Sequence, residues 1–391
     1  MEQFIVSAVR TPIGKFLGGL SSLTAPQLGA VVVKAALEKA QVGVELVDEV
    51  IMGQVLQAGV GQNPARQAAL FAGLPTSIAA YTVNKVCGSG LKAAMLASQA
   101  IKAQDAGIVV AGGMESMSLA PHLLQKSRTG FKYGDEKLVD ALIRDGLWCA
   151  FEQWPMGNAA EYIAQKCGVD RTAQDEFSAA SHQRAAQAQA AGAFANEIVQ
   201  VSVGSGSKTT IVAHDEGIRP DSSAENLARL KPAFQADGTV TAGNASQLSD
   251  GAAALVIASA TAVQAHQLQP LARIVAYATS GVDPKEIFIA PVSAVKMVLE
   301  RASMTIDQID LFELNEAFAA QMLACSQQLG LDSAKVNPHG GAIALGHPIG
   351  CSGARVLTTL VHALHHHGKR YGLASLCLGG GNAVAMIIER L

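Results

Sequence analysis

The chain has 391 residues, a formal net charge of -3 and apolar residues at 49% of its positions. A chain of this length exceeds what one hydrophobic core usually supports, so we expect two or three packed units. Because charges of both signs are scattered along it, the sequence shows no basic cluster that would indicate binding to nucleic acid or to an anionic membrane surface.

The cysteines and the N-terminus indicate the compartment. Dispersed cysteines without C-x-x-C pairs favour reduced thiols over a disulfide framework or a metal site. The start, MEQFIVSAVRTP, predicts no secretory or transit peptide, and no apolar run is long enough for a membrane span. We therefore expect a soluble cytoplasmic protein. The six cysteines are Cys87, Cys149, Cys167, Cys325, Cys351 and Cys377.

Strand-like and helix-like segments alternate over the first 118 residues. The segment at 28–40 has the periodicity of a helix, and 83–101 passes from a β-branched run into an Ala-rich helix pattern. This order predicts an α/β fold with a mostly parallel sheet. Strands are expected at 4–9, 48–55 and 107–113.

The regular alternation of strand-like and helix-like segments is interrupted between residues 119 and 248. We interpret this stretch as an inserted, loop-rich domain lying over the sheet. Thr172 and Asp175 are expected to form the capping box of a helix that carries Phe177 and ends near Gly192. The alternation then returns, with strands at 253–259 and in LARIVAYATSG and a helix around SAVKMVLERA.

A weak internal repeat indicates two related halves. CGSGLKAAMLASQAI (87–101) precedes the strand IVVAGG, and CSGARVLTTLVHAL (351–364) precedes the strand LASLCLGGG. Both place Cys and Gly just before a periodic helix. The expected units are residues 1–118 plus 249–268, the insertion 119–248, and residues 269–391.

Cys87 follows a strand and precedes a helix. Free N–H groups and the helix dipole at such a position favour a thiolate, and Gly88 and Gly90 leave room for a substrate. A small cysteine packed at a tight turn is the alternative.

Two further stretches carry chemistry. His347 lies between Gly346 and Pro348 in a glycine-dense loop, where an imidazole can take a proton from a thiol or simply bond turn backbone. Cys377 ends an apolar strand before three glycines, whose N–H groups can face an oxyanion; a buried strand cysteine is the alternative.

Together these motifs resemble the thiolases, and in particular their acetyl-CoA C-acetyltransferase branch. The resemblance extends along nearly the whole chain and implies a thiolase-like fold of two related, mostly parallel-sheet halves in α-β-α layers with an inserted loop domain. It rests on VCGSGLKAA, NEAFAAQ, GGAIALGHPIGCSGAR and CLGGGNA, with VRTPIGKF, AGGMESMS, RPDSSAENLARLKPAF and TVTAGNASQLSDGAAA.

The resemblance implies a role for each matching residue. Cys87 would receive the acyl group, His347 would activate it, and a water held by Asn315 would complete one oxyanion hole with His347. Cys377 would act as acid and base, and the N–H groups of Cys87 and Gly379 would form the second hole. This chemistry requires no metal or redox cofactor.

Coenzyme A thioesters are the implied substrates, and a homodimer or homotetramer is the implied assembly. Ser246 would bond a pantetheine amide and Arg219 would meet the adenine end. The other residues implied to line the coenzyme path are Phe234, Ala242, Leu248, Met156, Ala317 and Phe318.

The sequence departs from this family at three places. Pro155 replaces a histidine of the pantetheine loop, Phe288-Ile-Ala-Pro stands for Gly-x-Gly-Pro, and His339 replaces a common Asn. The first two bear on coenzyme affinity and chain length. The histidine run at 362–368 is interpreted as a solvated helix end instead of a metal site.

Three other functions remain as alternatives. One is a broader 3-ketoacyl-CoA thiolase of fatty-acid degradation. An NAD-dependent Cys/His aldehyde dehydrogenase is disfavoured because no G-x-G-x-x-G follows a strand. A non-catalytic coenzyme A-binding scaffold is disfavoured because both cysteines, His347 and Asn315 are present.

Overall fold

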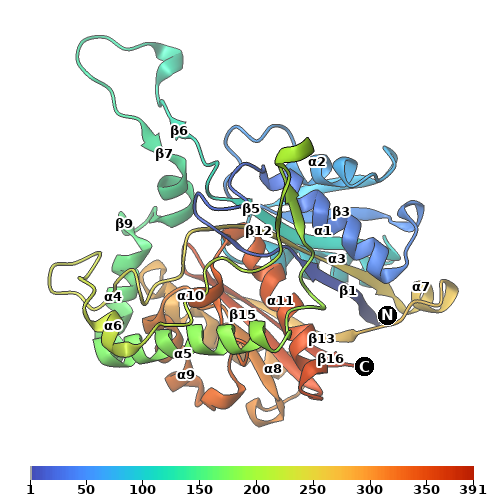
Figure 1. Cartoon of the computed structure of the whole chain (residues 1–391). Helices are drawn as coiled ribbons and strands as arrows, with labels where there is room; N and C mark the ends of the chain where they lie inside the picture. Colours follow the sequence, from blue (N-terminus) through green and yellow to red (C-terminus); the bar gives the residue numbers. More distant parts are fainter. Residues whose placement is uncertain (1) are drawn as a thin grey trace.

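A computed structural model describes residues 2–391, apart from the side chain of Ser207. Its strands form one continuous, strongly twisted sheet with two halves (Figure 1). Helices cover the outer face of each half, and further helices lie between the two halves. In spatial order the strands are β14 (Leu311–Leu314), β15 (Tyr371–Leu378), β16 (Asn382–Arg390), β13 (Ala272–Gly281), β1 (Gln3–Arg10), β12 (Ser249–Ser259), β5 (Ile108–Ser116), β3 (Glu49–Gly53) and β4 (Ala79–Val83), with β2 (Gly14–Lys15) paired to β12.

Each half of the sheet has one strand that runs against the others. In the first half β1, β3, β4 and β5 run the same way and β12 opposes them. In the second half β13, β14 and β15 share a direction and β16 opposes it. The expectation of two related, mostly parallel halves is therefore confirmed. They meet in a short antiparallel ladder, where Phe4 pairs with Arg273 and Ile5 with Ala272.

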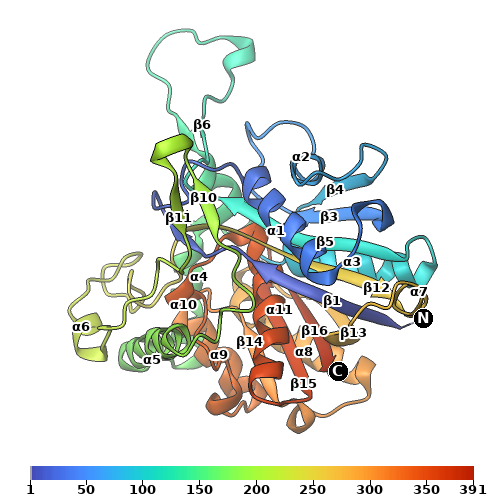
Figure 2. The ribbon, with the colours of Figure 1, turned by 45° about the vertical axis from the view of Figure 1, so that its right-hand side comes forward.

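Helices separate and cover the two halves in five layers, as Figure 2 shows. The first outer layer, α1 (Ala25–Ala40) and α2 (Pro64–Phe71), packs on the first half. The central layer, α3 (Ser89–Ala103) and α11 (Ile349–His366), packs on both halves. The second outer layer, α8 (Ala290–Ala302) and α9 (Ala319–Leu329), packs on the second half.

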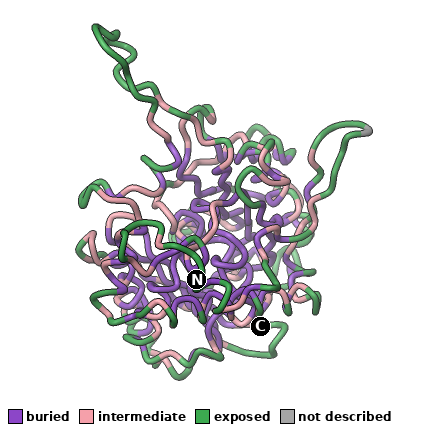
Figure 3. Tube along the Cα trace, turned by 60° about the vertical axis from the view of Figure 1, so that its left-hand side comes forward, coloured by how far each residue is buried: buried purple, intermediate pink, exposed green. Residues whose placement is uncertain are grey.

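The central helices approach closely because each carries a glycine at the crossing. A Cβ on Gly90 would lie 2.6 Å from the Ala354 nitrogen, and one on Gly353 would collide with Leu91. Both helices and the strands beside them are buried, and Figure 3 shows that the buried trace fills the interior. The internal repeat therefore marks the two helices of the buried central layer.

The repeat does not give its two cysteines the same place. Cys87 precedes the N-cap of α3, Gly88, whereas Cys351 is the third residue of α11 and is buried in the core. The expectation that both cysteines lie just before a helix is wrong for Cys351.

Residues 117–248 contribute no strand to the large sheet within the described chain. Helices α4 and α5 of this segment pack against α9, and α5 also packs against α10 (Ala342–Leu345), so the segment lies mainly on the second half. The expected boundaries at 119 and 248 stay a prediction. Its elements are β6 (His122–Leu123), β7 (Val139–Asp140), β8 (Trp148–Cys149), β9 (Trp154–Pro155), α4 (Met156–Cys167), α5 (Arg171–Ala190), β10 (Val201–Val203), β11 (Thr210–Val212) and α6 (Ala224–Ala228).

An arm between β6 and β7 projects from the body (Figure 1). Most of it is exposed, including the large side chains Phe131, Tyr133 and Leu138. Among residues 2–391 no helix combines the length and the apolar character needed to cross a bilayer.

The cap of α5 differs from the expectation. Asp170 is the N-cap and accepts the Ala173 N–H at 2.8 Å, so the capping box of Thr172 and Asp175 is wrong. Asp175 is instead buried and accepts from Arg171 and Asn244. The physical reason is that a buried tertiary partner outcompetes a local cap.

Candidate active site

Cys87 lies in a strained turn between β4 and α3. The residue before it, Val86, has φ 48°, a left-handed conformation that costs a β-branched residue about 1–3 kcal/mol. Three bonds hold the turn: the Lys85 N–H donates to Ser89 Oγ (2.8 Å), Ser89 Oγ donates to the Val86 carbonyl (2.6 Å), and the Val86 N–H donates to Asn84 Oδ1 (3.0 Å). The turn therefore fixes where the thiol points.

The glycines of this turn serve packing. A Cβ on Gly88 would lie 2.6 Å from Leu378 Cδ2, and Gly90 faces α11. The expectation that they leave room for a substrate is wrong. Gly88 instead lets the Cys87 turn press against the end of β15, which carries Cys377.

Burial raises the pKa of the Cys87 thiol to about 11. Hydrogen bonds to the sulfur from the Gly379 N–H and from its own N–H act in the opposite direction but are weaker. We expected the helix dipole and N–H groups to favour the thiolate; the N–H groups do so, but desolvation outweighs them. The same two N–H groups point at the sulfur.

His347 is buried, and burial lowers its pKa to about 3, so its ring is neutral near pH 7. Its Nδ1 lies 2.6 Å from Ser352 Oγ, which donates to the Pro348 carbonyl at 3.0 Å. Because that hydroxyl proton is used, Nδ1 must carry the ring hydrogen and Nε2 carries the lone pair. A neutral imidazole whose Nε2 carries a lone pair is a proton acceptor.

Asn315 packs beside this imidazole. Its Nδ2 lies 3.4 Å from Nε2 and 3.5 Å from Nδ1 of His347. Its Oδ1 is buried and has no protein partner among the described residues. A buried acceptor of this kind suits one proton of a water molecule.

Cys377 is the seventh residue of β15 and is buried. Burial raises the pKa of its thiol well above the usual value, and a negative charge on Cys87 raises it further. The two thiols are therefore near enough to influence each other's ionisation. Turn glycines 379–381 follow Cys377, and the Gly379 N–H reaches Cys87 Sγ.

A cavity of about 600 Å³ brings these groups together. Cys87, His347 and Cys377 all line it. Asn315 does not line the cavity but contacts His347, and the Gly379 N–H donates to the Cys87 sulfur. Of the expected coenzyme residues, the cavity is lined by Met156, Phe234, Ala242, Ser246, Leu248, Ala317 and Phe318.

Arg219 is absent from this lining. It is exposed, and its backbone N–H donates to His182 Nδ1 at 3.1 Å. Its position leaves it free to meet a group outside the cavity.

Two of the departures from the family pattern fall on the cavity wall. Pro155 lines it and offers no side-chain donor. Phe288 lines it as well, buried in a T-shaped contact with Phe318 at 5.1 Å between ring centroids. The third departure, His339, is outside the lining.

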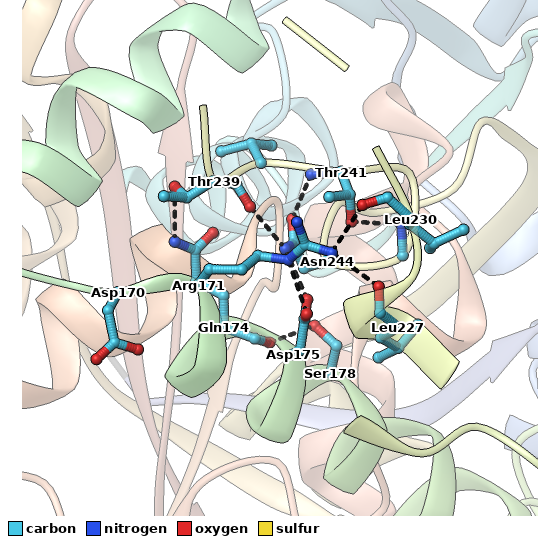
Figure 4. Close-up of polar contacts among 12 residues, drawn as sticks. Asp170, Arg171, Gln174, Asp175, Ser178, Leu227, Leu230, Thr239, Thr241 and Asn244 are labelled. Carbon is cyan, nitrogen blue, oxygen red and sulfur yellow. Dashed lines mark hydrogen bonds and ion pairs between the residues drawn. The ribbon is translucent and has the colours of Figure 1, made fainter. Parts of the chain in front are cut away.

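The wall segment 241–248 is held by a buried polar network, shown in Figure 4. Asn244 is at its centre: Nδ2 donates to Asp175 Oδ1 (3.0 Å) and to the Thr239 carbonyl (3.0 Å), and Oδ1 accepts the Thr241 N–H (2.8 Å). Asp175 also accepts from Arg171 Nε at 2.7 Å. The N-terminal turn of α5 thereby fixes Ala242 and the residues that follow it.

Two buried acidic residues that the motifs did not single out, Glu115 and Glu316, hold the loops beside the cavity. Glu115 accepts the N–H groups of Val55 (3.0 Å), Leu56 (3.2 Å) and Gly350 (2.9 Å), which joins β5 to the start of α11. Burial raises its pKa to about 7.

Glu316 accepts from Ser181 Oγ (2.6 Å), Asn337 Nδ2 (2.8 Å) and the Ile343 N–H (3.2 Å). It thereby fixes the glycine loop before His347. A signal for both was available, since an acidic residue inside an apolar or glycine-rich run must find partners when it is buried.

A strained turn with a half-buried cysteine, a neutral histidine and a buried cysteine therefore surround one cavity. The chain belongs to the thiolase family: residues 3–261 match the model for the thiolase N-terminal domain and residues 268–390 match that for the C-terminal domain.

Individual relatives cover almost the whole chain. An acetyl-CoA acetyltransferase of Cupriavidus necator is 56% identical over 99% of this chain and 98% of the relative, and one of Escherichia coli is 55% identical with the same coverage. The crystal structure of the Bacillus anthracis acetyl-CoA acetyltransferase superposes with a TM-score of 0.98 at 42% identity, covering 100% of this chain and 99% of that one.

Proposed function

We propose that the chain is an acetyl-CoA C-acetyltransferase that condenses two acetyl-CoA to acetoacetyl-CoA and coenzyme A, and reverses that reaction. As a member of the thiolase family it is an acyltransferase enzyme. The observation that carries the proposal is that Cys87, Cys377 and a neutral His347 line one cavity. Full-length relatives named for this activity support it.

In the first half-reaction the Cys87 thiol loses its proton to Nε2 of His347. The thiolate attacks the acetyl carbonyl of the first acetyl-CoA and the carbon–sulfur bond to coenzyme A breaks. The leaving thiolate takes the proton of Cys377, which remains as a thiolate, while His347 keeps the proton of Cys87. The N–H groups that already point at the sulfur, those of Cys87 and Gly379, are placed to stabilise the oxyanion. The product is an acetyl thioester on Cys87.

In the second half-reaction the Cys377 thiolate removes an α-proton from a second acetyl-CoA and becomes a thiol again. The carbanion attacks the acetyl carbonyl on Cys87, and the Cys87 thiolate leaves and recovers its proton from His347. The enolate oxygen is met by His347 and by a water whose other proton is accepted by Asn315 Oδ1.

The acetyl group keeps the charge off Cys87 while Cys377 is ionised. A thiolate on Cys87 would raise the Cys377 pKa, whereas the thioester is neutral. Cys377 can therefore be ionised without facing a second thiolate. His347 and the two thiols carry every proton transfer and fixed donors stabilise both oxyanions, so we propose a reaction without metal or redox cofactor.

The broader alternative is a 3-ketoacyl-CoA thiolase of fatty-acid degradation. The apolar side chains packed around Cys87 include Met117, Leu142 and Ile349, and they favour a short acyl group on the sulfur. Thiolysis of four-, six- and eight-carbon 3-ketoacyl-CoA substrates tests this. Equal or faster turnover of the longer substrates would reject acetyl specificity and support a place in fatty-acid metabolism.

For coenzyme A, we propose that the pantetheine arm runs along Met156, Phe234 and Ser246, with Arg219 outside the cavity at the adenine end. The cavity lining supports the first part, and the exposure of Arg219 is compatible with the second. Pro155 and Phe288 would tune affinity. A raised KM for coenzyme A in Arg219→Ala, with kcat unchanged, would agree with this path; an unchanged KM would remove Arg219 from it.

We further propose a cytoplasmic homodimer or homotetramer. Its six free cysteines suit a reducing compartment. The edge strand β4 leaves Tyr81 and Val83 only half-buried, and the arm exposes Phe131 and Tyr133. A second copy of the chain would cover these surfaces. Light scattering of the purified protein decides this, and a monomer mass would contradict it.

A further inference from the structure

Three histidines from two segments of the chain converge outside the lining of the cavity. His339 precedes α10, and His366 and His367 end α11. One ring nitrogen from each lies within 4.8 Å of the other two. The ring centroids are 5.3 Å apart for His339 and His366, 5.1 Å for His339 and His367, and 4.9 Å for His366 and His367.

The separation of the closest pair fits two ligands of one metal ion. Nε2 of His339 lies 3.1 Å from Nε2 of His367. With metal–nitrogen bonds of about 2.0–2.1 Å, two ligands are about 2.9 Å apart in octahedral geometry and about 3.3 Å apart in tetrahedral geometry. The observed value falls between the two. His366 is exposed, so its ring is free to turn toward the same point.

The end of the helix makes consecutive histidines converge. Neighbouring residues inside a helix point about 100° apart, but His367 is the C-cap of α11, with φ -93° and ψ 2°. Its ring can therefore face the same point as that of His366. The carbonyls of the last turn carry the negative end of the helix dipole, which favours a cation there.

The surroundings also suit a cation. His339 is buried and packs edge-on against Phe194, with 5.8 Å between ring centroids. The buried carboxylate of Glu197 interacts electrostatically with the His339 ring and favours positive charge there.

We propose that His339, His366 and His367 form a binding site for one late first-row divalent cation, with Zn²⁺ as the first candidate. Three imidazoles without a carboxylate favour zinc, nickel, cobalt or copper over magnesium or calcium. Water fills the open positions of the ion. The ion replaces the hydrogen bond between the His339 and His367 rings, and each ring keeps its proton on the nitrogen that faces away from the ion.

The site would have a structural effect. It joins the loop before the catalytic glycines to the far end of α11. That helix begins two residues after His347 and has 18 residues, so the ion would lie about 25 Å from His347. The ion would therefore stabilise the fold and leave the chemistry at Cys87 unchanged.

The test uses the full chain, freed of metal with a chelator and then titrated with Zn²⁺ in competition with a chromophoric chelator. The triple variant His339→Asn, His366→Ala, His367→Ala keeps all six cysteines, so thiol-bound zinc is the same in both proteins. We expect the wild type to bind one more equivalent than the triple variant and its Tm to rise with zinc. His339→Asn alone should weaken that binding at least about tenfold.

His365→Ala is the matched control. His365 lies on the same helix end, but its Nε2 meets the Leu271 carbonyl at 2.9 Å instead of the cluster. This variant should bind zinc as the wild type does, and thiolysis activity without zinc checks that every variant is folded. Equal zinc binding by the wild type and the triple variant would overturn the proposal. So would an equal loss of affinity in His365→Ala and His339→Asn.

Discussion

The ionisation of Cys87 gives the sharpest prediction, because it separates two mechanisms of acylation. Burial raises the pKa of this thiol to about 11 and lowers that of His347 to about 3. At pH 7 about one Cys87 in ten thousand is then ionised. The resting site is a thiol beside a neutral imidazole, and the proton moves only when the substrate is attacked.

The perturbation is a change of pH in the Cys377→Ala variant, which removes the second thiol from the cavity. Only the thiolate is alkylated by iodoacetamide. The alkylation rate at Cys87 should therefore rise about tenfold per pH unit, or about a hundredfold between pH 7 and pH 9. Mass spectrometry of the peptide that contains Cys87 measures the rate.

A thiolate–imidazolium pair would behave differently. It would give a rate that is already constant between about pH 6 and pH 8, and that result would refute the argument from burial. His347→Asn serves as a second variant: its alkylation profile should keep the same slope, while its acetylation by acetyl-CoA should fall because the proton acceptor is gone. A large rise in the apparent pKa in His347→Asn would instead indicate a pre-formed pair.

Three further predictions follow from single residues. Asn315→Ala should lower kcat for acetoacetyl-CoA thiolysis by about 10²–10³ with little change in KM, because one oxyanion position loses its support; an unchanged kcat would remove Asn315 from the site. Leu142→Ala should raise the ratio of six-carbon to four-carbon thiolysis, whereas the exposed control Leu138→Ala should not. Glu115 is protonated in the fold up to about pH 7 and in the unfolded chain only to about 4.5. It therefore contributes stability that is lost as the pH rises through that window. The stability of wild type relative to Glu115→Gln should accordingly fall by up to about 3 kcal/mol from pH 4.5 to above pH 7 in denaturant titrations, and a flat difference would contradict the burial of that charge.

The sequence predicted those features of the fold and of the candidate site that depend on neighbouring residues in the chain. Cys87, His347 and Cys377 each lie at a junction of a periodic segment with glycines, and such junctions are visible in the residue pattern. The alternation of strands and helices predicted the α/β class, and the weak internal repeat indicated two related halves. The β16 strand that opposes its neighbours carries no local mark of its direction.

What could not be predicted depends on burial and on contacts between distant segments. The sequence favoured a lowered pKa for Cys87, whereas the structure raises it. A helix terminus can be recognised in the sequence, but the extent of desolvation cannot. The φ of Val86 is forced by three bonds that only the folded turn makes. Glu115 and Gly350 are 235 residues apart in the chain, and His339 meets His367 across 28 residues. No local pattern links such pairs.

The most direct test of the two-thiol mechanism is mass spectrometry of the protein after incubation with acetyl-CoA, in the wild type, Cys87→Ser and Cys377→Ala. We predict one acetyl group on Cys87 in the wild type and in Cys377→Ala, none in Cys87→Ser, and no acetoacetyl-CoA from Cys377→Ala. An acetyl group carried by Cys377, or equal labelling of the two variants, would contradict the assignment of acyl carrier and base.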